Sequence, residues 1–312
     1  MAGQGSKIVA TDFNTIQSKI QAVLGTGGTN PNTGLADSTF GYGQTPVSIQ
    51  VAANAKISVN QWSNLRTDLV KARQHQTGIT VGSRESTDPL FVAGQDLKIP
   101  TTSNKITETD RATYNQMADY VVTDRLLAAS GQLSRETMSN LTYSTNWNGT
   151  LSHIITVTFS TTDVPRYFFN TGGYFDFSAS HNITGADSKN TAWKNVINGI
   201  GAVTFSRTTT TSTGSGTSSA IGFVHLTTSD QMIYQKLSST YTPNQYRIYA
   251  RLGATANIMI FTLQFADLSG QPNPPWGTDE SIIGSITSKG EIIRATGVNV
   301  SIASPTVSAS FS

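Results

Sequence analysis

The sequence predicts an α+β protein in which an N-terminal region of short helices precedes an antiparallel, jelly-roll-like β-sandwich. Up to about residue 135, apolar residues recur at steps of three and four, which is typical of amphipathic helices. After about residue 140 they alternate with polar residues, which is typical of strands. We therefore expect two domains: residues 1–135, a helical assembly region, and residues 136–312, a β-sandwich that is displayed.

A repeat organises the first of these regions. The dipeptide Lys-Ile recurs at an interval of 49 residues, at 7–8, 56–57 and 105–106. Each copy precedes a polar capping residue and an amphipathic stretch with an aromatic residue, so we expect repeated strand-cap-helix units. The first two copies align without gaps, whereas the third places its aromatic residue later, and Lys98-Ile99 competes for the third register.

Helix start and stop signals delimit three N-terminal helices. Thr11 is placed to cap the first helix, and Gly25 is placed to end it. Ser58 and Gln61 have the spacing of a capping box for the second, with Gly78 as its stop. The third begins near Thr107 and continues to about residue 129. Residues 25–47 read as a loop, and residues 47–51 as a possible strand.

Apolar stripes on these helices are candidate assembly contacts. A repeated scaffold without chemistry favours packing between subunits, and three short helices would present their stripes to such a neighbour. The candidate assembly residues are Phe13, Ile16, Ile20, Trp62, Leu65, Leu69, Tyr114 and Met117.

The second half contains many short strand candidates separated by turn signals, which favours an antiparallel sandwich. They are residues 154–159, 174–179, 201–205, 221–226, 246–251, 257–265, 282–287, 292–295 and 298–302, with one inserted helix at 191–200. Aromatic residues of this half could stack on a host sugar, although core or interface packing is the more ordinary use of such rings. The candidate glycan contacts are Trp193, Tyr241, Tyr246 and Trp276.

Composition and motifs argue against several classes of function. Charged residues are 13% of the chain and the net charge is +2, which gives nucleic-acid binding little support. No apolar run is long enough for membrane insertion, and there is no cysteine. Four histidines are isolated in sequence, and no nucleophile elbow, phosphate loop or zinc motif occurs. We expect no catalytic residue, no metal and no cofactor.

Several stretches, taken together, resemble virion structural proteins of tailed bacteriophages, with the closest likeness to cyanophages and related aquatic phages. The first two are residues 1–16 (MAGQGSKIVATDFNTI) and 61–69 (QWSNLRTDL). Residues 166–173 (RYFFNTGG) follow in the middle of the chain, and residues 284–288 and 294–300 are similar to the family's C-terminal pattern.

This resemblance implies a non-enzymatic structural component of a virion, made in the host cytoplasm. A tail or neck appendage subunit, such as a fibre or adaptor, is favoured over a baseplate component. The implied partners are further copies of the chain, with a trimer favoured, and other tail, neck or baseplate proteins. Three alternatives remain open: a receptor-binding module that recognises host-surface glycan, a capsid decoration protein and an envelope-degrading enzyme.

Overall fold

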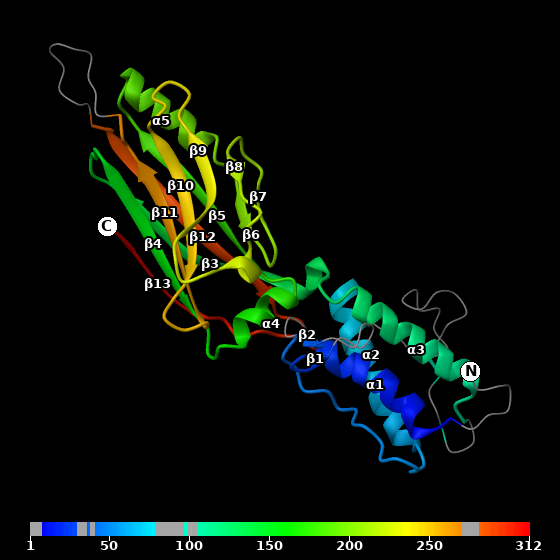
Figure 1. Ribbon diagram of the computed structural model, residues 1–312. Helices are drawn as coiled ribbons and strands as arrows, with labels where there is room; N and C mark the ends of the chain where they lie inside the picture. Colours follow the sequence, from blue (N-terminus) through cyan, green and yellow to red (C-terminus); the bar gives the residue numbers. More distant parts are fainter. Residues whose placement is uncertain are drawn as a thin grey trace. The chain divides into compact units, whose positions relative to one another are not determined.

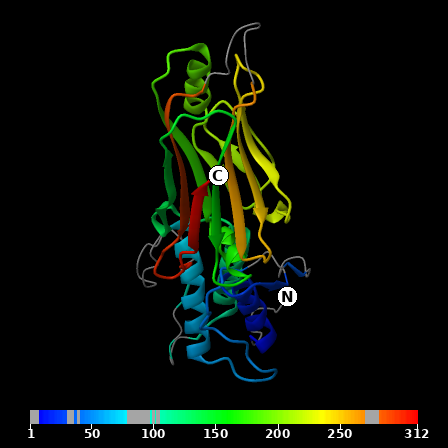
Figure 2. The same cartoon turned by 90° about the vertical axis from the view of Figure 1, so that its left-hand side faces the viewer.

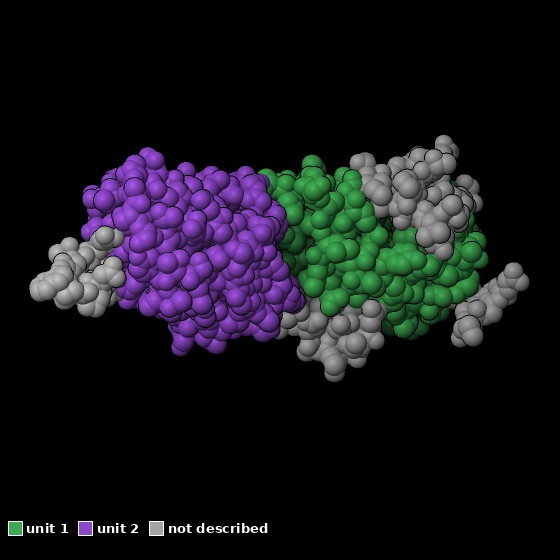
Figure 3. All heavy atoms as spheres, turned by 90° about the horizontal axis from the view of Figure 1, so that it is seen from above, with its two compact units in different colours: residues 1–134, 166–172, 294–302 green, residues 135–165, 173–293, 303–312 purple. Residues whose placement is uncertain are grey.

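A computed structural model describes residues 8–29, 36–37, 41–78, 97–98, 101, 105–269 and 281–312. Over these residues the protein is α+β, with five α-helices and two large antiparallel sheets (Figure 1). Chain contacts divide it into the two compact units coloured in Figure 3. Unit 1 consists of residues 1–134, 166–172 and 294–302, and unit 2 of residues 135–165, 173–293 and 303–312. Two stretches from the second half of the sequence therefore belong to unit 1.

Unit 1 is built on three helices that contact one another pairwise, α1 (Ala10–Leu24), α2 (Val59–Thr77) and α3 (Glu108–Thr123). A two-stranded pair, β1 (Gly28–Thr29) with β2 (Ala36–Asp37), and a 3₁₀ turn, η1 (Ser130–Gln132), complete its N-terminal part. Short helix α4 (Val164–Asn170) enters unit 1 at Arg166.

The three helices begin 49 residues apart. Their N-cap residues are Val9, Ser58 and Thr107, and each has extended backbone dihedrals. In all three, the side chain three positions later accepts a hydrogen bond from the N-cap N–H, at 3.0, 2.6 and 2.8 Å. The caps at Ser58 and Thr107 confirm the predicted starts. Thr11 is not the first cap, because the carboxylate of Asp12 reaches back to Val9.

The strand expected before each helix is absent from the described residues that precede them. Residues 8–9, 55–58 and 105–107 belong to no strand. Residues 47–51 are not a strand either, because side chains from the helices hold them. Asn14 exchanges two hydrogen bonds with the backbone of Val51, at 2.8 and 2.9 Å. Asp68, fully buried, accepts from the N–H groups of Val47 and Ser48 at 3.0 and 2.7 Å.

The segment 166–172 is fixed in unit 1 by specific contacts. Asn170 donates to the carbonyl of Gly41 at 3.0 Å, and His75 Nε2 donates to the carbonyl of Thr171 at 3.1 Å. The Tyr167 ring lies against Gly43, whose φ is +70°. A side chain at Gly43 would be strained in that conformation and would collide with the ring.

Unit 2 contains a six-stranded sheet ordered β13-β4-β11-β10-β9-β8 and a five-stranded sheet ordered β3-β12-β5-β6-β7. The first comprises β4 (Thr150–Thr158), β8 (Thr217–Ser218), β9 (Gln231–Leu237), β10 (Gln245–Leu252), β11 (Ile258–Ala266) and β13 (Thr306–Phe311). The second comprises β3 (Leu133–Tyr143), β5 (Tyr174–Ile183), β6 (Val203–Phe205), β7 (Thr210–Ser212) and β12 (Gly284–Ala295). Helix α5 (Ser188–Asn198) packs on β5 and β10, and a 3₁₀ turn, η2 (Phe223–His225), precedes β9.

Aromatic side chains join the two sheets in a sandwich-like arrangement, seen from the side in Figure 2. Phe261 on β11 contacts Phe175 and Phe177 on β5, with ring centroids 5.2 and 4.8 Å apart. It also contacts Phe205 on β6 at 5.4 Å. All four rings have at most 1% of their surface exposed. The core of unit 2 therefore lies between the sheets, as the alternating sequence pattern predicts.

Some details of the expected β-region are corrected. Residues 221–226 contain η2, and residues 298–302 form a bend with one isolated bridge; neither is a strand. The jelly-roll winding is not confirmed. Consecutive strands pair as meanders, β5-β6-β7 and β8-β9-β10-β11, while a jelly roll is wound from two Greek keys. Short loops between neighbouring strands favour such local pairing.

A buried histidine connects the sheets. His153 on β4 lies 2.9 Å from the hydroxyl of Ser139 on β3 and 2.8 Å from that of Ser288 on β12. No part of its side chain is exposed, and burial lowers its pKa to about 4. Both ring nitrogens have a hydroxyl partner, so the neutral imidazole is satisfied within the sandwich.

We expect acid to destabilise unit 2 through His153. Because the folded pKa lies below the ordinary value of 6.5, the contribution is fully present above pH 6.5 and is lost as the pH falls towards 4. The loss should be on the order of 3 kcal/mol. Urea unfolding between pH 4 and 7.5 measures it, and His153→Gln should remove this part of the pH dependence, while the part due to buried His75 of unit 1, whose pKa is also lowered by burial to about 4, remains. Exposed His225→Gln is the control; an equal pH dependence in all three proteins would contradict this assignment.

Candidate functional site where three helices begin

The predicted assembly residues lie in the core of unit 1. Trp62 is 4% exposed and the other seven are fully buried: Phe13, Ile16, Ile20, Leu65, Leu69, Tyr114 and Met117. Their side chains are therefore unavailable to another subunit, which corrects the expectation. The apolar stripes of three helices cover one another within a single chain. These buried stripes offer no open apolar surface through which a trimer could form.

Three aromatic rings, one from each helix, contact one another in this core. Phe13 of α1 and Trp62 of α2 meet edge to face with ring centroids 5.2 Å apart, and Trp62 meets Tyr114 of α3 at 4.9 Å. The hydroxyl of Tyr114 donates to the carbonyl of Lys98 at 2.8 Å, and burial raises its pKa above the ordinary value. Trp62 thus lies between the other two helices and fixes their spacing.

The aromatic residue of α3 comes later in its helix than those of α1 and α2. Counting in steps of 49 residues, Tyr114 occupies the position of Ile16 and Leu65, one helical turn after Phe13 and Trp62. Arg111 occupies the position in α3 that corresponds to Phe13 and Trp62, and it pairs with Glu108 at 2.5 Å. The cap at Thr107 agrees with the register that starts at residue 105 and not with the competing one at residue 98.

A pocket opens where the three helices begin. Its volume is about 1320 Å³, and it includes the isoleucine from each Lys-Ile copy, Ile8, Ile57 and Ile106. Trp62 belongs to its wall, together with Lys56, Lys105, Val9, Ala53, Ala55, Val59 and Glu108. We call this the cap-end pocket. It brings together the isoleucines of three dipeptides that are 49 residues apart in the sequence.

The electrostatics of the cap-end pocket favour an apolar ligand with some negative charge. The helix N-termini contribute little to anion binding, because Asp12, Gln61 and Asp110 already cap them. Two exposed lysines, Lys56 and Lys105, stand among half-buried isoleucines. The carboxylate of Glu108 pairs with Arg111, whose hydrogen bonds lower the pKa of Glu108.

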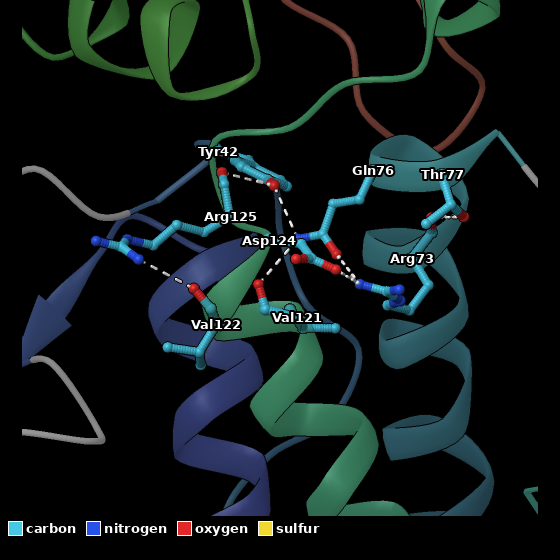
Figure 4. A network of polar contacts seen from close by, with 8 residues as sticks. All are labelled: Tyr42, Arg73, Gln76, Thr77, Val121, Val122, Asp124 and Arg125. Carbon is cyan, nitrogen blue, oxygen red and sulfur yellow. Dashed lines mark hydrogen bonds and ion pairs between the residues drawn. The ribbon is translucent and has the colours of Figure 1, made fainter. Parts of the chain in front are cut away.

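The C-terminal ends of α2 and α3 are closed by a polar network, drawn in Figure 4. Buried Gln76 donates to the hydroxyl of Tyr42 at 3.0 Å and to the carbonyl of Val121 at 2.9 Å. Arg73 donates to Gln76 at 3.0 Å and pairs with Asp124 at 2.5 Å. Burial raises the pKa of Tyr42 well above its ordinary value. These contacts end α3 at Thr123, earlier than the predicted residue 129.

The predicted glycan contacts do not form one surface. Trp193 and Tyr246 are fully buried and belong to the aromatic core, which corrects the expectation for both rings. Trp193 meets Trp147 at 4.9 Å, and Tyr246 meets Phe265 at 4.9 Å. Tyr241 is half-buried, and its hydroxyl lies 2.6 Å from that of Ser188. Trp276 lies outside the described residues.

Two clusters in unit 2 resemble catalytic arrangements but have structural roles. Ser139, His153 and Ser288 are buried between the sheets, where no substrate reaches them. Asp176 and Glu291 face each other on β5 and β12, yet Arg135 bridges them at 2.8 and 2.6 Å. Hydrogen bonds from Lys289 and Arg135 lower the pKa of Glu291, the opposite of what a general acid needs.

Within the described ranges, no group of three or more His, Cys, Asp or Glu side chains is placed to hold a metal ion. None of the helices in these ranges combines the length and apolar character of a transmembrane span. Comparisons with protein-family models, with curated proteins and with solved structures find no match to the chain. Its function must therefore be argued from its own residues and geometry.

Sequence reasoning missed residues that shape unit 1. Asp68 and Asn14 organise residues 47–51, and His75 anchors residues 166–172. Asp68 lies on the apolar face of α2. A carboxylate buried there needs hydrogen-bond partners, so its position in the sequence is a signal of a structural role. The partners themselves are backbone groups and leave no pattern in the sequence.

Truncating Trp62 and Ile57 to alanine separates the contribution of the core residue from that of its neighbour in the pocket wall. Trp62→Ala should lower the free energy of unfolding of unit 1 by about 3–5 kcal/mol, because it leaves a cavity between Phe13 and Tyr114. Half-buried Ile57→Ala, in the same pocket wall, should cost roughly 1 kcal/mol. Urea unfolding measures both, and equal losses would show that Trp62 does not hold the helices together.

Proposed function

We propose that this protein is a non-enzymatic structural component of a tailed-bacteriophage virion, a tail or neck appendage subunit that attaches through unit 1. One observation carries the proposal. Of the stretches that resemble virion proteins, residues 8–16, 61–69, 166–172 and 294–300 all belong to unit 1. Residues 284–288, on β12, and Gly173, the last residue of the stretch 166–173, belong to unit 2. The likeness thus follows a folding unit and not a continuous piece of chain.

The close integration of these stretches supports a shared task for unit 1. Besides the contacts of Asn170 and Thr171, the backbone N–H of Thr296 donates to the carbonyl of Gln132 at 3.0 Å. Gln44 donates to the carbonyl of Ser301 at 3.2 Å. Residues from three distant parts of the chain therefore depend on one another for their conformation, as expected of a platform that must present one defined surface.

We infer that the three helices are copies of one cap-helix unit with a period of 49 residues, and that the cap-end pocket is their functional surface. The pocket offers exposed apolar atoms next to two lysines, which suits an apolar segment of another virion protein that carries a carboxylate. The apolar core of unit 2 is buried between its own two sheets, so unit 2 is then the displayed part.

Incorporation into particles tests this proposal. Ile57→Asp places a charge in the apolar wall of the cap-end pocket and should reduce the amount of protein in purified virions at least about tenfold. Quantitative mass spectrometry of particles from a host that supplies the variant measures the loss. Circular dichroism before the assay establishes that the variant is folded.

The matched control is Met232→Asp, an equally polar change at an exposed residue of β9. It should enter particles at the wild-type level. If Ile57→Asp is incorporated normally, the pocket is not the attachment surface; if wild-type protein is absent from particles, the virion assignment itself is wrong. Deletion of residues 1–135 is a poorer test, because residues 166–172 and 294–302 also build unit 1.

A further inference from the structure

Strand β13 is an edge of unit 2. It is the last strand of the six-stranded sheet and pairs on one side with β4, from Thr306 opposite Thr158 to Phe311 opposite His153. Over the described residues no strand pairs with its other side. Figure 2 shows β13, in red, turned towards the viewer. Its outer backbone groups are therefore available to another chain.

The register determines which groups these are. Ser152 and Ser312 exchange two hydrogen bonds, from Ser152 N–H at 3.0 Å and from Ser312 N–H at 2.8 Å. In an antiparallel pair, residues alternate between those bonded to the neighbouring strand and those that point away. Counting back from Ser312, the N–H and C=O groups of Val307, Ala309 and Phe311 point to the open edge.

The side chains alternate in the same way. Val307, Ala309 and Phe311 are half-buried towards the opposite sheet, where the Phe311 ring lies 5.6 Å from Tyr143. Thr306, Ser308 and Ser310 are exposed on the outer face. An incoming strand would thus find a hydrogen-bonding edge with an apolar inner face and a hydroxyl-bearing outer face.

The other edges of unit 2 are protected. β3, the edge of the five-stranded sheet on the side of Tyr143, carries Arg135 and Glu136. At the opposite ends, β7 and β8 have three and two residues. Charges and short length are ordinary means of preventing strand addition. β13 has six residues without a charge or a proline, so it lacks both kinds of protection.

We propose that β13 is an interface at which a second copy of this chain adds its own β13, antiparallel and related by a two-fold axis at Ala309. In this register Ala309 faces its counterpart, and Val307 faces Phe311 of the other copy. Each facing pair exchanges two hydrogen bonds. The two six-stranded sheets become one continuous sheet, and the half-buried Val307 and Phe311 side chains gain a partner on the same face.

Self-complementarity favours a second copy over an unrelated strand. A two-fold axis brings every residue near it close to its own duplicate, so a charged residue there would repel itself. β13 has none, and its central residue is alanine, which is small enough to face itself. The resulting Val–Phe pairs join a β-branched and an aromatic residue, a favourable cross-strand combination. The inference does not depend on attachment to a virion.

Proline substitution isolates the outer edge. Ala309→Pro removes an N–H that points away from β4, so the fold is retained and only the pairing between copies is weakened. The dimer dissociation constant, measured by sedimentation equilibrium on the full chain, should rise about 10- to 100-fold. Ser310→Pro removes an N–H that bonds to β4 and should instead lower the melting temperature, which distinguishes the two sides of the strand.

Cysteine cross-linking tests the register directly, because the chain has no cysteine of its own. Ala309→Cys should form a disulfide-linked dimer under mild oxidation, since residues facing across the axis have Cα atoms about 5.5 Å apart. Exposed Thr137→Cys on β3 is the control and should remain largely uncross-linked. The proposal is overturned if the wild-type protein is still monomeric at 100 times the concentration used for cross-linking, or if it is trimeric. Equal cross-linking of both cysteine variants also overturns it.

Discussion

The edge-to-face packing of Trp62 between Phe13 and Tyr114 is the interaction on which the organisation of unit 1 depends. The starts of the three helices are 49 residues apart in the chain, yet residues at all three starts line one pocket. In each helix the side chain three positions after the N-cap accepts a hydrogen bond from the N-cap N–H, which fixes the segment just before the helix. Because these segments carry the Lys-Ile dipeptides, their isoleucines meet in the cap-end pocket.

The two units use buried polar groups in different ways. In unit 1, Asp68 and Gln76 fix loops and helix ends through backbone contacts. In unit 2, His153 links the sheets through two serine hydroxyls, and the ion pair between Lys189 and Asp267, 2.7 Å apart, is almost fully excluded from solvent. Such groups are costly unless paired, so they specify how the segments meet more than they add stability. None of them supplies an accessible nucleophile or general acid.

The helices and most strands could be predicted from the sequence, because their signals are local. Ser58 with Gln61, and Thr107 at the third start, have the spacing of a capping box, and the alternation in β4 and β11 is regular. What covers an apolar face is not local. The apolar stripe containing Ile16 has the same sequence pattern whether another subunit or a neighbouring helix buries it. In the structure, neighbouring helices of the same chain bury it. The docking of residues 166–172 similarly depends on Gly43 and His75, which are far away in sequence. The sequence shows the repeated Lys-Ile dipeptides, but not that their isoleucines line one pocket, and the assembly residues predicted from the helix stripes lie in the core instead.

We propose that this protein attaches to a virion through unit 1 and displays unit 2. A density map of the particle tests this most directly. A cryo-electron microscopy reconstruction of the tail and neck region, with this chain placed in it, would show which surface faces the particle. The account predicts that a segment of another virion protein occupies the cap-end pocket and contacts Ile57 and Ile106. A particle in which unit 2 makes the attachment, with the pocket open to solvent, would contradict it.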